Sequence, residues 1–136
     1  MSTPLDRAAA AVAGVDLRIL QHWESFCGWL LLQTAKWPKS ARFTLTQRLE
    51  NHALDVTEML VTARYEPQQR PSLLRSVNLR LERMRFLCRL ARAGQLATPA
   101  AFERACRDLD DCGRMLHGWR VAIGERRGTP PTEAHA

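Results

Sequence analysis

Apolar side chains recur along most of the chain at steps of three and four residues, and no stretch alternates convincingly with a period of two. Such steps place side chains on one face of an α-helix. Prolines at 38, 67, 71 and 99 divide the middle of the chain into blocks of helical length, because proline removes a backbone donor and disfavours helical geometry in the residue before it. The pattern predicts four helices, over about 16–36, 39–65, 71–93 and 99–126.

Each predicted helix has one continuous apolar face. The face of the third helix is the most regular, and it consists of Leu74, Val77, Leu81, Met84, Cys88 and Ala91. The apolar face of the fourth helix consists of Phe102, Ala105, Leu109, Cys112, Leu116, Trp119 and Ile123. Four helices joined by short loops pack as antiparallel neighbours. We therefore predict an all-α fold, an antiparallel up-down-up-down four-helix bundle.

Residues near the helix ends set the expected boundaries. Thr98 followed by Pro99 is a typical helix start, and Gly94 is suited to the position just after a helix. The small, polar, proline-rich end of the chain lacks a periodic apolar face. We expect a flexible or frayed segment over 1–15, the bundle over 16–126 and a disordered tail over 127–136.

Three of the helices show a second apolar line away from the core face. In the third helix it is formed by Leu79, Phe86 and Leu90. A monomeric bundle needs one apolar stripe per helix, and large exposed apolar patches usually mark interfaces. We therefore predict a homo-oligomer. Its interface is expected to include Trp29, Leu32, Leu54, Val61, Leu79, Phe86 and Leu90.

The positive charge of the chain is concentrated on the third helix. Residues 70–92 hold seven arginines and one glutamate, which accounts for the whole net charge of +6. A localised basic stripe is typical of a surface that binds nucleic acid, although a solvated face or an acidic protein partner would fit the same charge. The predicted nucleic-acid-binding residues are Arg75, Arg80, Arg83, Arg85, Arg89 and Arg92.

The sequence lacks recognisable catalytic or metal-binding spacing. The four histidines form no HxxxH, HExxH or ExxH motif, and the four cysteines lie on or beside the core faces without a CxxC pair. Asp108, Asp110 and Asp111 are expected to form a solvated face or to pair with arginines, rather than to bind a cation. We expect no enzyme activity, no cofactor and no metal site. No signal peptide or membrane-spanning run is evident, so we expect a cytoplasmic protein.

The segment WPKSARFTLTQRLENHALDVTEMLVTARY, residues 37–65, resembles a four-helix-bundle family that includes proteins encoded in intervening sequences of 23S rRNA genes. More narrowly, it is similar to the accessory variability determinant (Avd) of diversity-generating retroelements. The matching features in this segment are Pro38-Lys39, Arg42-Phe43, Leu45, Gln47-Arg48 and Glu50. In the third helix they are Asn78, Leu81, Arg85-Phe86-Leu87 and Arg89-Leu90. The resemblance covers about residues 16–126.

The resemblance implies more than the spacing does. Avd-like proteins are basic bundles that form rings, typically pentamers, and have no known catalytic centre. They bind the reverse transcriptase of the element and its template RNA, and the partner nucleic acid here is expected to be RNA or DNA. The Avd-like protein and the reverse transcriptase together make cDNA in which template adenines are miscopied, and this cDNA diversifies a target gene. Two alternatives stay open: a protein–protein scaffold, and an rRNA intervening-sequence protein.

Overall fold

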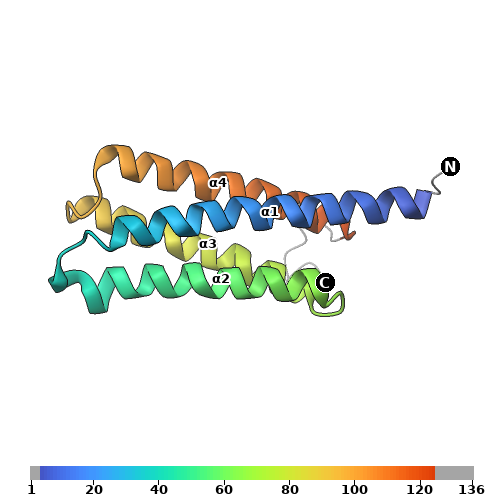
Figure 1. Ribbon diagram of the computed structural model, residues 1–136, viewed down its shortest axis with the longest axis horizontal. Helices are drawn as coiled ribbons and strands as arrows, with labels where there is room; N and C mark the ends of the chain where they lie inside the picture. The colour runs from blue at the N-terminus through green and yellow to red at the C-terminus, as the bar shows by residue number, and fades with distance from the viewer. Residues whose placement is uncertain (1–3, 125–136) are drawn as a thin grey trace, which may run out of the picture.

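The computed structural model describes residues 4–124 and confirms the all-α four-helix bundle (Figure 1). Helices α1 (Pro4–Thr34), α2 (Gln47–Tyr65), α3 (Arg70–Ala93) and α4 (Pro99–Ala122) alternate in direction. Each helix packs against its neighbours in chain order, and α4 closes the bundle against α1. Over the described part of the chain there is no strand, and no helix is long and apolar enough to cross a membrane. The tail expected over 127–136 lies outside the described residues.

Two helices begin differently from the expectation. The backbone of α1 is helical from Pro4 instead of Asp16, and its N-terminal end projects beyond the other helices (Figure 1). The Ala-rich sequence there has high helix propensity, and proline is tolerated in a first helical turn. The expected second helix is divided, since a 3-10 turn, η1 (Lys39–Ala41), and a π turn, η2 (Arg42–Thr46), precede α2. A π turn holds more residues than an α turn.

The core is made by the predicted apolar faces. All six residues of the α3 face are buried, and so are five of the seven on the α4 face, while Phe102 and Ile123 are partly buried. Trp23 of α1 enters the core and donates its ring N–H to the carbonyl oxygen of Ala53, at 3.1 Å. Three cysteines, Cys27, Cys88 and Cys112, are buried and free. Burial raises the pKa of the Cys88 and Cys112 thiols to about 12, so both remain protonated.

The turn between α3 and α4 places a non-glycine residue in the left-handed region. The N–H of Leu96 donates to the carbonyl of Ala91 at 2.9 Å, and the N–H of Gln95 donates to that of Arg92 at 3.1 Å. These two bonds form a Schellman motif. Its left-handed residue is Gln95, with φ 61°, whereas Gly94 has φ −82°. The helix ends at Ala93 as expected, but the left-handed position after it is taken by Gln95 instead of Gly94.

The strain at Gln95 gives a stability prediction. Gln95→Gly is expected to raise the free energy of unfolding by about 0.5–1 kcal/mol, because glycine adopts the left-handed region without the Cβ penalty. Urea unfolding followed by circular dichroism measures it. The matched control is Gln47→Gly, at φ −63°, which should lower the free energy of unfolding by about 0.5–1 kcal/mol. Destabilisation by both glycines would contradict the assignment of strain to Gln95.

Candidate nucleic-acid interface

The arginines of α3 lie outside the core face but differ in their surroundings. Arg80 is directed toward α2, where its Nη1 donates to Asp55 Oδ2 at 2.8 Å and lies 3.1 Å from His52 Nδ1. Its side chain is 26% exposed. Because an arginine donates and never accepts, His52 Nδ1 is the acceptor in this contact. His52 is thus a hydrogen-bonded residue.

Arg85 is directed the other way, toward α4. It pairs with Glu82 on its own helix and with Asp110 Oδ1 at 3.2 Å. Its Nη2 also lies 3.4 Å from the carbonyl oxygen of Leu109, and a Cβ at Gly113 would approach this nitrogen to 3.2 Å. Arg85 therefore links α3 to α4. Arg80 and Arg85 are both used within the fold, which leaves less of their charge for a phosphate than the sequence pattern suggested.

The other predicted arginines are more accessible. Arg75, Arg83 and Arg89 are exposed, and Arg92 is half-buried. The guanidinium of Arg89 lies over the ring of Phe86, 4.3 Å from its centroid. This cation–π contact holds a positive charge beside an exposed aromatic ring.

A groove of about 300 Å³ lies between α2 and α3 beside these arginines. It is lined by Arg48, His52, Arg83, Phe86 and Leu87, and none of these five side chains is a carboxylate. We call it the basic groove. It brings Arg48 of α2 to the same site as Arg83 of α3, which the sequence pattern alone did not suggest.

Burial and the positive charge around the basic groove both affect the pKa of His52. Its pKa is lowered, first by burial and then by the charges of Arg80 and Arg83, with a further contribution from Arg48. Asp55 acts in the opposite direction. Burial and the neighbouring guanidiniums favour the neutral form of the His52 imidazole. The basic groove can therefore attract an anion and offers an aromatic ring on which a base can stack.

The expected interface residues are mostly exposed. Those with large exposure are Leu32, Leu54, Val61, Leu79, Phe86 and Leu90. Leu54 and Val61 line a second groove, of about 360 Å³, between α1 and α2, together with Leu20 and Gly28. We call this the apolar groove, and we call Leu79 and Leu90 the α3 ridge.

Trp29 lies elsewhere. It is half-buried and packs against the core. Its ring is 4.6 Å from the guanidinium carbon of Arg104 on α4. Trp29 therefore offers less exposed area to another subunit than the other expected interface residues do, and its part in an interface stays a prediction.

The acidic residues of α4 pair with arginines, which is one of the two arrangements that the sequence predicted. Asp108 pairs with Arg104 at 3.5 Å, Asp110 pairs with Arg85, and Asp111 pairs with Arg114. These contacts neutralise the acidic side of α4.

Comparison with known proteins identifies a family. A family model described as bAvd-like matches residues 17–123. This range contains all of α2, α3 and α4 and most of α1, so both grooves lie within it. No curated protein and no solved structure matches the chain.

Proposed function

This chain belongs to the bAvd-like family, and on that basis we propose that it is a non-catalytic accessory protein of a diversity-generating retroelement. It binds the error-prone reverse transcriptase of the element and its template RNA in the cytoplasm, and it supports mutagenic cDNA synthesis. The observation that carries this proposal is the family match across most of the bundle. The Avd resemblance of residues 37–65 and of α3 supports the same reading.

The basic groove supports RNA as the anionic partner. Arg48 and Arg83 lie on facing helices, so a phosphate between them would receive donors from both sides. Phe86 at the edge of the groove offers its ring to an unstacked base, which is how single strands are commonly held. We assign Arg48, Arg75, Arg83, Arg89 and Arg92 to RNA contact. Arg80 and Arg85 support this surface through their ion pairs with α2 and α4.

The exposed apolar residues support assembly into a ring. The α3 ridge and the apolar groove are two different surfaces on different sides of one bundle. When unlike surfaces join head to tail, the contact is heterologous, and it closes into a ring if the rotation allows. We propose that the α3 ridge of one subunit enters the apolar groove of the next, and that the ring has five subunits, as the resemblance implies.

The proposal is tested with the purified protein, its labelled template RNA and the reverse transcriptase encoded beside it. We expect RNA binding whose affinity falls steeply as salt rises, because phosphate contacts release counterions. We also expect the reverse transcriptase to co-purify with the protein. Binding of the enzyme without RNA would favour the scaffold alternative. Binding of neither, or a gene located inside an rRNA operon without a reverse transcriptase, would refute the proposal.

A further inference from the structure

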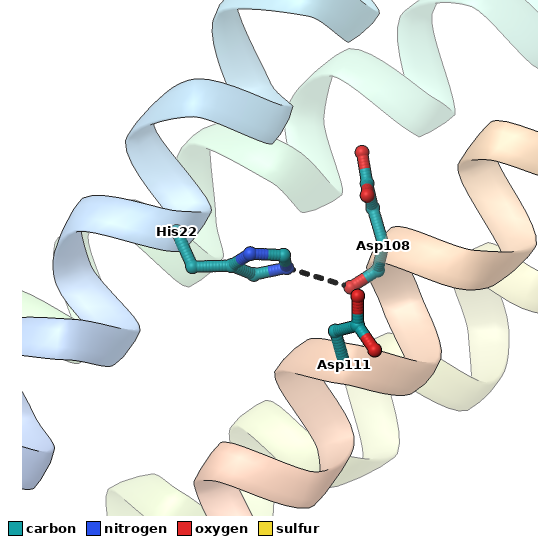
Figure 2. Close-up of side chains that lie close together, drawn as sticks. All are labelled: His22, Asp108 and Asp111. Carbon is teal, nitrogen blue, oxygen red and sulfur yellow. Dashed lines mark hydrogen bonds between the residues drawn. The ribbon is translucent and has the colours of Figure 1, made fainter.

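Three side chains with metal-ligating groups converge between α1 and α4, whereas the basic groove lies between α2 and α3. His22 extends from α1, and Asp108 and Asp111 extend from α4 (Figure 2). One donor atom from each residue lies within 4.8 Å of the other two, and all three residues are partly buried. Sequence spacing gave no sign of this cluster, because His22 and Asp108 are separated by 86 positions.

Local structure explains why the cluster forms. Residues three apart on a helix share a face, so Asp108 and Asp111 both face α1. His22 Nε2 lies 2.9 Å from the backbone carbonyl oxygen of Asp108, and Figure 2 shows the ring directed at α4 between the two carboxylates. The imidazole is therefore already oriented toward the oxygens with which it would share an ion.

Neighbouring residues hold the carboxylates in place. Arg104 Nε lies 3.5 Å from Asp108 Oδ2, and the Arg104 guanidinium is itself stacked against Trp29 of α1. Arg114 pairs with one oxygen of Asp111. A carboxylate has two oxygens, so each aspartate keeps one for a further partner. Hydrogen-bonded partners that orient the ligands are a general feature of metal sites.

We propose that His22, Asp108 and Asp111 form a binding site for one divalent transition-metal ion, best matched by Zn²⁺. Imidazole nitrogen and carboxylate oxygen are both good zinc ligands, and three protein ligands leave an open position for water. Tetrahedral ligands about 2.1 Å from the ion lie roughly 3.4 Å apart, so side-chain rotations within the cluster must bring the donors closer. When the ion binds Nε2, the ring carries its proton on Nδ1, so the imidazole stays neutral and no net proton is released from it.

The site would join the first helix of the bundle to the last. Because it uses none of the residues assigned to RNA contact or to assembly, it is independent of the proposed function. Bound zinc adds a link between α1 and α4 and stabilises the folded state by mass action.

The test is isothermal titration of the full chain with ZnCl₂. We expect one equivalent to bind wild type, and affinity at least tenfold weaker in His22→Gln and in Asp111→Asn, because each lacks one of three ligands. Two matched controls should bind like wild type. His117→Gln removes another half-buried histidine, and Asp110→Asn makes the same charge change one residue away.

Circular dichroism without metal shows whether each variant is folded. If His22→Gln does not fold, the zinc affinity of Asp111→Asn decides the test. The proposal is overturned if the ligand variants bind as tightly as their controls, or if wild type binds no zinc. It is also overturned if the Co²⁺ complex shows a strong near-ultraviolet thiolate band, because the ion would then be held by cysteine.

Discussion

Replacing Leu79 and Leu90 of the α3 ridge by glutamate is expected to turn the assembled protein into folded monomers. In the single chain these side chains are 52% and 56% exposed, so a carboxylate there remains hydrated and the bundle stays folded. At a subunit contact the same carboxylates would be buried without partners. Burying these unpaired carboxylates costs several kcal/mol of binding free energy per interface. A loss of that size is enough to dissociate a contact of ordinary affinity.

Light scattering coupled to gel filtration gives the mass, and circular dichroism gives the helix content. Val121→Glu is the control, because Val121 is as exposed as the ridge but lies near the end of α4, so its variant should assemble like wild type. A wild-type protein that is monomeric at tens of micromolar, or a ridge variant that still assembles, would refute the proposed interface.

Mixing two variants tests the head-to-tail arrangement. Val61→Glu in the apolar groove should also give monomers. A ridge variant and a groove variant each keep one intact surface, so a 1:1 mixture should form a heterodimer through the single intact contact and go no further. A contact between like surfaces would instead let only one of the two variants assemble, with itself.

Replacing Arg48 and Arg83 by glutamine is expected to weaken RNA binding by about tenfold or more, whatever the RNA sequence. The change removes two charged donors from the basic groove, and a hydrogen bond to a charged group contributes about 1.5–3 kcal/mol. The plot of log affinity against log salt should become shallower by about 0.7 for each lost single-strand phosphate contact. Filter binding at several salt concentrations measures both quantities.

The control for charge is Arg18→Gln with Arg107→Gln, which alters two exposed arginines on α1 and α4 by the same amount. It should leave the salt slope near that of wild type. Phe86→Leu tests stacking separately, and we expect weaker binding with an unchanged slope. If the groove variant binds RNA as its control does, the basic groove is not the RNA surface.

Sequence periodicity predicted the bundle well because burial of one helical face depends on local spacing. All six residues of the α3 face lie in the core. Structural details that depend on one or two backbone angles were harder to predict from the periodicity. The π turn before α2 and the left-handed Gln95 after α3 have no periodic signature, so the start of α2 and the residue that terminates α3 were not predicted.

The candidate site was only partly predictable, because it depends on which helices face each other. The charge of α3 indicated a basic surface, and Arg85 was expected to belong to it. The structure instead commits Arg85 to α4 and brings Arg48 and His52 of α2 beside Arg83. A pattern read along one helix cannot show a partner on another. The histidine and aspartates between α1 and α4 were missed for the same reason.

The closure of α4 against α1 sets an order of events during synthesis on the ribosome. α1 leaves the ribosome first, yet contacts such as that between His22 and Asp108 join residues 86 positions apart. At roughly 5–20 residues per second, the nascent α1 waits on the order of 10 s before α4 exists. During that interval the face of α1 that packs against α4 lacks its cover. Nascent chains should therefore bind hydrophobic chaperones until α4 emerges, and release them when the bundle closes.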